Sequence, residues 1–261
     1  MLVSRYDAFL LDLDGVLYRG AVAVDGAVDT MARLRTLGGR VAFVTNNSSR
    51  TPEAVAAKLR GLGIAADASE VETSALTTAS MLAERGVATA FVVGEEGITR
   101  ALSDRGVAVV EGEPAAVDVV VVGLDRQADY AELRTASILV ESGVPLVATN
   151  ADASFPAADG RAWPGAGALL AAIEVTTGAR AEVVGKPNAP ILRAALARAG
   201  GGTPLVIGDR LETDIAGAGA MGWDSLLVLT GIARREDLEA SEAQPTFVGE
   251  DLGALFETPS G

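Results

Sequence analysis

Two carboxylates stand at alternate positions where an apolar segment near the N-terminus ends. Phe9-Leu10-Leu11 is followed by Asp12 and Asp14, and then by Gly15. Such an apolar run is typical of a strand that is buried on both faces of a parallel sheet. Alternate residues of an extended backbone point the same way, so both carboxylates are predicted to face one spot. Two like charges held there require a cation or a shared proton, although Asp and Gly are also common in ordinary turns.

Three further sets of polar residues follow predicted strands or loops. They are Thr45 with Asn46 and Asn47, then Lys186, and then Asp209 with Asp214. Each set alone has an ordinary interpretation. The first could consist of turn residues, Lys186 could be a solvated lysine, and the two aspartates could stand at the start of a helix, where the helix dipole favours carboxylates. Open α/β sheets bind their ligands at the carboxyl ends of the strands. Together, in this order, the four sets therefore favour a site for phosphoryl transfer.

The composition excludes several kinds of chemistry. The 261 residues contain no His and no Cys, which excludes histidine bases, Ser-His-Asp triads, cysteine nucleophiles, imidazole or thiolate zinc sites and disulfides. An enzyme with this composition must use carboxylates, Lys, Arg, hydroxyls, backbone amides and hard metals. A site rich in carboxylates suits Mg²⁺.

The charge and the hydropathy of the chain restrict its partners. The net charge of −14 opposes binding to a nucleic acid polymer or to an anionic membrane surface. It also opposes anionic substrates, so a phosphate site needs a local positive charge or a metal. No apolar run is long enough to span a bilayer, and acidic residues interrupt the N-terminal segment where a signal peptide would be apolar. We therefore expect a cytoplasmic protein.

Strands and helices alternate along the chain and predict parallel sheets joined by right-handed βαβ units. The pattern starts again near residue 80, in a second α/β layer that lacks the carboxylate pairs of the first. We interpret residues 80–183 as a domain that is inserted into a first domain, formed by residues 1–79 and 184–261.

Two phosphate-binding patterns are rejected. Residues 217–222 fit G-x-G-x-x-G, but the residues before them indicate a helix and a strand follows, the reverse of the dinucleotide-binding order. We therefore predict a helix end there. Gly185-Lys186-Pro187 is not a P-loop, because Pro187 replaces the required Ser or Thr.

Four segments resemble the motifs of the haloacid dehalogenase (HAD) superfamily of phosphohydrolases, and the similarity covers nearly the whole chain. In chain order they are Asp12-Leu13-Asp14-Gly15-Val16-Leu17-Tyr18, Val44-Thr45-Asn46, Gly185-Lys186-Pro187, and Gly208-Asp209-Arg210-Leu211-Glu212-Thr213-Asp214-Ile215. The insert lies between the second and third motifs, which resembles the C2-capped, type IIA branch. The resemblance implies an α/β fold, with a Rossmann-like core on a parallel sheet and an inserted α/β C2-type cap.

The resemblance also implies a mechanism. Asp12 would attack phosphorus and form an aspartyl phosphate, and Asp14 would act as general acid and base. Asp12, Asp209 and the backbone carbonyl of Asp14 would hold Mg²⁺, the expected cofactor, and Asp214 would complete the metal site by orienting these ligands from a second layer. Catalytic Lys186 would also bind the substrate phosphate, together with Thr45, Asn46 and Asn47.

The substrate is expected to be a small phosphorylated metabolite that is selected by the cap. Asn150, Asp152, Phe155 and Trp163 are candidates for facing the leaving group, although each could equally be a packing residue. Phe155 stands where pyridoxal phosphate phosphatases carry an important histidine, which weakens that assignment. The resemblance also raises a homodimer formed through the cap, for which the sequence shows no exposed apolar stripe.

Two alternatives remain open at this point. A phosphotransferase or phosphomutase would use the same intermediate but pass the phosphate to an acceptor other than water. A non-catalytic module would bind Mg²⁺ or phosphate as a signal, although it would need no leaving-group acid such as Asp14.

Overall fold

The computed structural model describes residues 1–156 and 161–257, and their contacts divide the chain into two compact units. The first unit comprises Met1–Thr45, Glu53–Glu72 and the chain from Lys186 onward, and the second comprises Asn46–Pro52 and Thr73–Gly185. The predicted insert, residues 80–183, falls inside the long segment of the second unit. Its assignment as a cap with those boundaries stays a prediction.

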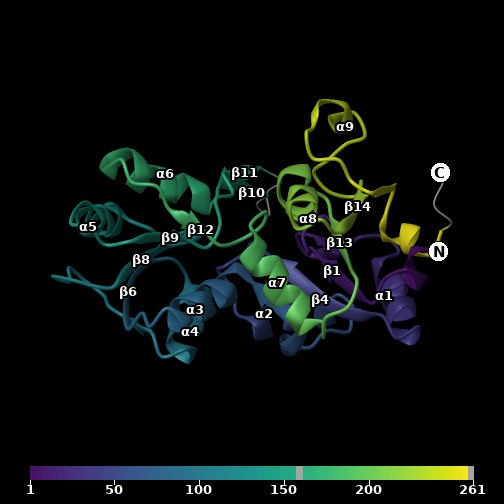
Figure 1. Ribbon diagram of the computed structural model, residues 1–261, viewed down its shortest axis with the longest axis horizontal. Helices are drawn as coiled ribbons and strands as arrows, with labels where there is room; N and C mark the ends of the chain where they lie inside the picture. Colours follow the sequence, from purple (N-terminus) through teal and green to yellow (C-terminus); the bar gives the residue numbers. More distant parts are fainter. Residues whose placement is uncertain (157–160, 258–261) are drawn as a thin grey trace. The chain divides into compact units, whose positions relative to one another are not determined.

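The first unit is built on a six-stranded sheet in the order β15-β14-β13-β1-β4-β5 (Figure 1). Its strands are β1 (Ala8–Leu11), β4 (Arg40–Thr45), β5 (Val71–Thr73), β13 (Pro204–Gly208), β14 (Asp224–Val228) and β15 (Phe247–Gly249). Strand β1 runs parallel to both β13 and β4, and Leu11 lies opposite Ile207 and Phe43. This register brings the next residues of the three strands to the same level of the sheet.

Apolar side chains cover both faces of this sheet. Phe9 and Leu11 belong to one buried cluster, whereas Leu10 belongs to another. The first cluster includes side chains of α1 (Ala27–Thr36) and α2 (Pro52–Gly61), and the second includes those of α7 (Ala189–Arg198) and α8 (Ala216–Met221). The prediction that this N-terminal strand is buried on both faces is therefore confirmed.

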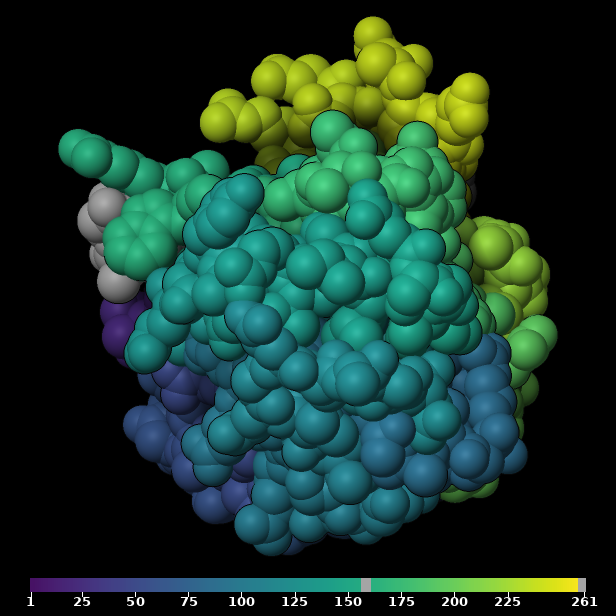
Figure 2. Space-filling model, turned by 90° about the vertical axis from the view of Figure 1, so that its left-hand side faces the viewer, coloured from purple at the N-terminus to yellow at the C-terminus, as the bar shows by residue number. Residues whose placement is uncertain are grey.

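The second unit is a separate α/β layer with a five-stranded parallel sheet in the order β12-β9-β8-β6-β7. Its strands are β6 (Thr89–Val93), β7 (Ala108–Val109), β8 (Val119–Val122), β9 (Leu146–Ala148) and β12 (Glu182–Val183), and its helices are α3 (Ser74–Glu84), α4 (Glu96–Asp104), α5 (Tyr130–Glu141) and α6 (Ala166–Thr177). Successive valines of β8 enter two different apolar clusters, so this sheet is also covered on both faces. In Figure 2, the blue-to-green segments of this unit lie side by side on the surface facing the viewer.

Several short elements were not predicted from the sequence. They are two antiparallel hairpins, β2 (Tyr18–Arg19) with β3 (Val22–Ala23) and β10 (Ser154–Pro156) with β11 (Ala162–Pro164), and single-turn helices at Leu2–Ser4, Ala68–Glu70, Asp237–Ala240 (α9) and Leu252–Phe256. Strand β15, the last strand of the described residues, was not predicted either. Its three residues show no alternation that would mark them.

The G-x-G-x-x-G segment is a helix end, as predicted. A π-helical turn (Leu211–Ile215) leads into α8, and Gly222 ends that helix with a positive φ of 66°. Strand β14 then begins at Asp224. The glycines of this segment thus serve packing and helix termination rather than dinucleotide binding. In the part of the chain that the structure describes, no helix has the length and apolarity to cross a membrane.

Two leucines near the end of α1 provide a test of the core. Leu34 is completely buried, whereas 57% of Leu37 is exposed. We expect Leu34→Ala to lower the free energy of unfolding by about 2–5 kcal/mol, because it removes buried methyl groups and leaves a cavity. Leu37→Ala, the matched control, should change it by no more than about 0.5 kcal/mol. Urea denaturation followed by circular dichroism measures both, and equal losses would contradict this account of the core.

Candidate active site

Lys186 lies between two carboxylates that come from different parts of the first unit. Its ammonium group donates hydrogen bonds to Asp12 Oδ1 at 2.5 Å and to Asp214 Oδ1 at 2.6 Å, and a third to the carbonyl of Val44 at 3.2 Å. Only 4% of Lys186 is exposed. An ammonium has three N–H donors, so these three acceptors match its full donor capacity.

The charges of this cluster change the pKa values of its members. Burial lowers the pKa of Lys186, but the carboxylates of Asp12 and Asp214 outweigh it and raise that pKa above its ordinary value. Burial raises the pKa of Asp12, and the ammonium of Lys186 opposes this shift. The lysine therefore stays charged and is the cation that favours the ionised form of Asp12.

Asp209 adds a third carboxylate, and the oxygens of Asp12, Asp209 and Asp214 lie within 4.8 Å of one another. One oxygen of Asp209 accepts a hydrogen bond from the amide of Ile232 at 2.7 Å. The other, Oδ1, is buried and has no hydrogen-bond partner among the described residues. Burial, together with the charge of Asp214, raises the pKa of Asp209 to about 6.

This donor set fits a hard divalent cation. If all three carboxylates are ionised, the single ammonium leaves two negative charges uncompensated. A buried carboxylate oxygen without a partner is costly unless an unseen ligand satisfies it. Carboxylate oxygens are also the ligands that Mg²⁺ prefers.

Close backbone approach fixes Asp209 in this position. Gly15 has a φ of +85°, and a Cβ at Gly15 would lie only 2.3 Å from Asp209 Oδ2. Glycine alone adopts this backbone conformation readily and leaves room for the carboxylate. Asp209 of the fourth motif can therefore occupy this position only because residue 15 of the first motif is glycine.

Asp14 lies beside this cluster, and its side chain is not one of the three grouped carboxylates. Its backbone pairs with that of Tyr18 in β2 through an isolated parallel β-bridge. Burial raises the pKa of Asp14, while the charge of Lys58 and a hydrogen bond from the Tyr18 hydroxyl oppose the shift. No role was predicted for Lys58 or for Tyr18, although Tyr18 is part of the first motif, and the scarcity of lysine in the chain was the only available signal for Lys58.

The predicted phosphate-binding segment is shared between the two units. Thr45 is buried at the end of β4 in the first unit, and Asn46 begins the second. The Asn46 carbonyl accepts hydrogen bonds from Ser74 Oγ and Asn150 Nδ2, both at 2.7 Å. Its side-chain amide donates to Asp152 Oδ1 at 3.1 Å. These contacts hold Asn46 inside the second unit, and its role in phosphate binding stays a prediction.

The remaining candidates also have local contacts in the second unit. The Asn47 side-chain oxygen accepts hydrogen bonds from the amide and hydroxyl of Ser49. Phe155 and Trp163 pair edge to face across the β10–β11 hairpin, with ring centroids 6.2 Å apart. That any of these residues faces the leaving group stays a prediction.

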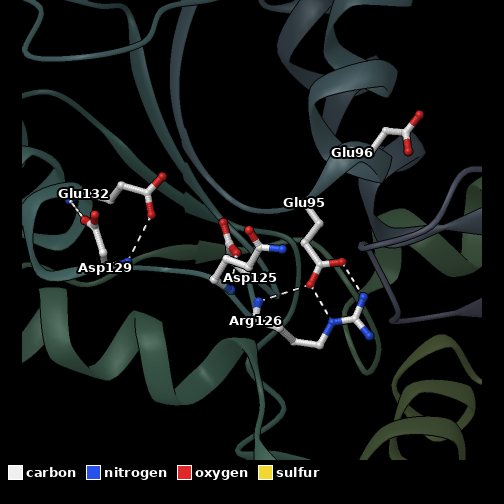
Figure 3. Close-up of a pocket in the computed structure, with 7 residues that line it drawn as sticks. Glu95, Glu96, Asp125, Arg126, Asp129 and Glu132 are labelled. Atoms are coloured by element: carbon white, nitrogen blue, oxygen red, sulfur yellow. Dashed lines mark hydrogen bonds and ion pairs between the residues drawn. The ribbon is translucent and has the colours of Figure 1, made fainter.

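A pocket of about 580 Å³ in the second unit is a poor candidate for binding phosphate. Figure 3 shows that carboxylates dominate its lining and that Glu95 pairs with Arg126 through both of its oxygens. Asp129 and Glu132 form a capping box at the start of α5. The one arginine in the lining is thus already paired, and the net charge of the lining repels an anion.

Comparison with known proteins places the chain among phosphatases. A family model described as haloacid dehalogenase-like hydrolase matches residues 9–108, and a second HAD-hydrolase-like model matches residues 183–255. The acid sugar phosphatase of Staphylococcus saprophyticus is 37% identical over 258 residues, which cover 98% of each chain.

Solved structures agree with this assignment. A glycerol phosphate phosphatase from Mycobacterium tuberculosis, solved with calcium and also with magnesium, matches at a TM-score of 0.92 with 36% identity. For the calcium complex, the match covers 97% of this chain and 76% of that one. A thermostable NPPase double mutant from Geobacillus stearothermophilus matches at a TM-score of 0.87 with 37% identity, over 95% of this chain and 96% of that one. The chain therefore belongs to the haloacid dehalogenase-like hydrolases, within the type IIA phosphatases of that superfamily.

Proposed function

We propose that this phosphatase is a Mg²⁺-dependent phosphomonoester hydrolase that works through an aspartyl phosphate on Asp12. One observation supports it most: the Lys186 ammonium contacts Asp12 and Asp214 beside an unpartnered buried oxygen of Asp209. Phosphoryl transfer through a covalent intermediate uses a nucleophilic carboxylate, a positive charge held beside it and a carboxylate oxygen that can bind a metal ion.

The chemistry proceeds in two displacements. A carboxylate oxygen of Asp12 forms a bond to phosphorus while the bond from phosphorus to the leaving oxygen breaks, and Asp14 gives its proton to that oxygen. A water oxygen then attacks the same phosphorus, its proton passes to Asp14, and the Asp12 carboxylate is released together with inorganic phosphate. The burial that raises the pKa of Asp14 favours the protonated form that the first step uses.

The cation and the lysine have separate tasks. Asp12, Asp209 and Asp214, with the backbone carbonyl of Asp14, would hold Mg²⁺, which supplies positive charge for a phosphate beside carboxylates. Lys186 orients Asp12 and offsets negative charge on the phosphate oxygens. Thr45, at the buried end of β4, would donate its hydroxyl to the phosphate, with Asn46 and Asn47 as further ligands.

The relatives narrow the substrate to a sugar phosphate or glycerol phosphate. One relative is named an acid sugar phosphatase and one solved neighbour a glycerol phosphate phosphatase. Both names also favour water over another acceptor, so hydrolysis is preferred to the phosphotransferase alternative. Measurement of free phosphate against phosphorylated acceptor, with a panel of sugar and polyol phosphates ranked by kcat/KM, tests both points.

Replacement of the nucleophile tests the mechanism. We expect Asp12→Asn to lower kcat for p-nitrophenyl phosphate by at least about 10³-fold, because the carboxamide cannot form the intermediate. The exposed Asp29 of α1 offers a control, and Asp29→Asn should keep the activity of the unmodified protein. A carboxylate trapped as aspartyl phosphate after acid quench would identify the same residue by mass spectrometry. Near-normal turnover of Asp12→Asn would refute the assignment.

Thermal unfolding tests the cation site without an assay of turnover. Mg²⁺ at 100 times its dissociation constant should stabilise the folded protein by about 2.7 kcal/mol. In Asp209→Asn this rise in Tm should largely disappear, because the unpartnered carboxylate oxygen is lost, whereas Asp29→Asn should respond like the unmodified protein. Activity provides a second, separate readout, because a chelator should abolish it and added Mg²⁺ should restore it. The cation site is assigned wrongly if Mg²⁺ raises the Tm of Asp209→Asn as far as it raises that of the unmodified protein.

A further inference from the structure

The loop that follows strand β14 contacts the proposed cation site from outside the four motifs. It consists of Thr230, Gly231, Ile232 and Ala233, all in the first unit. We propose that this 230–233 loop fixes Asp209 against the first motif and thereby sets the affinity of the site for Mg²⁺, with Thr230 and Gly231 as positioning residues. The inference rests on the proposed function, because it concerns the cation which that function uses.

The 230–233 loop holds Asp209 through two backbone amides. The Ile232 amide donates a hydrogen bond to Asp209 Oδ2 at 2.7 Å, and the Ala233 amide donates one to the Asp209 carbonyl at 3.0 Å. Consecutive residues of one loop therefore bind both the side chain and the main chain of Asp209. The bond to Oδ2 orients the carboxylate, so that Oδ1, which has no partner among the described residues, is the oxygen left for a cation.

Glycine at position 231 permits this close approach. A Cβ on Gly231 would lie 2.5 Å from Asp209 Cβ and nearer still to its carboxylate, where a distance below 3.0 Å forces one of the groups to move. Gly231 has no positive φ, unlike Gly15, so only this contact opposes a side chain there. A Cβ on Gly15 would also lie 3.0 Å from Gly231 Cα, so the two glycines approach each other as well as Asp209.

Thr230 joins the loop to the first motif. Its hydroxyl donates a hydrogen bond to the Gly15 carbonyl at 2.6 Å, and the Gly15 amide donates one to the Tyr18 carbonyl at 2.8 Å. That amide shares a planar peptide group with the Asp14 carbonyl, a proposed ligand of the cation. Thr230 therefore holds the residue next to this backbone ligand, while its neighbours in the loop hold the carboxylate ligand.

The 230–233 loop is itself anchored at both ends. Arg19 of β2 donates a hydrogen bond through Nε to the Thr230 carbonyl, and the Leu229 amide donates one to the Gly249 carbonyl of β15 at 3.0 Å. Ala233 is buried in an apolar cluster that includes two side chains of the fourth motif. The loop therefore gives Asp209 a defined position before a cation binds, which favours tight binding.

Calorimetric titration of the chelator-treated, full-length protein with Mg²⁺ tests the inference. Thr230→Val removes the hydroxyl and keeps the shape, and Gly231→Ala places a methyl group against Asp209. We expect each to raise the dissociation constant for Mg²⁺ by about tenfold or more, the usual effect of losing a group that orients a metal ligand. Thr230→Ser, which keeps the hydroxyl, should recover much of the affinity. The Mg²⁺ concentration for half-maximal hydrolysis of p-nitrophenyl phosphate should rise in the same order.

Two matched controls come from the same unit. The exposed Thr36 of α1 donates its hydroxyl to a carbonyl of its own helix, and a Cβ on the exposed Gly61 of α2 would meet no atom within 4 Å. Thr36→Val and Gly61→Ala should bind Mg²⁺ like the unmodified protein. Unchanged dissociation constants in Thr230→Val and Gly231→Ala, or equal losses in the controls, would overturn the inference. If circular dichroism shows that Gly231→Ala does not fold, Thr230→Val decides.

Asp209→Asn separates this inference from the proposed function. If Mg²⁺ binds the unmodified protein but not Asp209→Asn, and the Thr230 and Gly231 variants bind it normally, only the role of the loop is wrong. If the unmodified protein binds no Mg²⁺, or Asp209→Asn binds it as tightly, the cation site is assigned wrongly, and the role of the loop is lost with it.

Discussion

The ammonium of Lys186 makes the site of the first unit feasible. Three carboxylates within 4.8 Å of one another, two of them buried and one half-buried, repel each other strongly where little water screens them. Among the described residues, the buried ammonium of Lys186 is the positive charge that forms ion pairs with two of these carboxylates, Asp12 and Asp214. The rest of the site depends on this contact, because without it Asp12 would lose the cation that favours its nucleophilic form.

The register of the central strands positions two of the groups that contact Lys186. Leu11 pairs with Phe43 on one side and with Ile207 on the other, all in parallel register. Asp12 follows Leu11 directly after β1, Val44 follows Phe43 within β4, and both accept hydrogen bonds from Lys186. A shift of one residue in either pairing would exchange the two faces of the strands and would separate these acceptors. The apolar packing of the sheet and the geometry of the site are therefore one constraint.

The parts predicted from the sequence are those with strong local patterns. The buried strand before Asp12 and the helix end at Gly222 are marked by apolar runs and by glycine. The β2–β3 and β10–β11 hairpins were not predicted, because strands of two or three residues carry no readable period. The contact of Lys58 with Tyr18 was missed for another reason: it joins two elements that are distant in the chain, and such a contact has no local signature.

The use of lysine in this chain has a physical reason. The sequence contains only two lysines, Lys58 and Lys186, while arginine supplies every other basic side chain. An ammonium is a compact point charge whose three N–H groups diverge, whereas a guanidinium is planar and directs its donors in a fork. Only the former can reach Asp12, Asp214 and a backbone carbonyl from one buried atom. Lys58 lies over an aromatic ring, where either cation is accepted. The site therefore requires lysine at position 186 by geometry, whereas the ring contact at position 58 does not distinguish lysine from arginine.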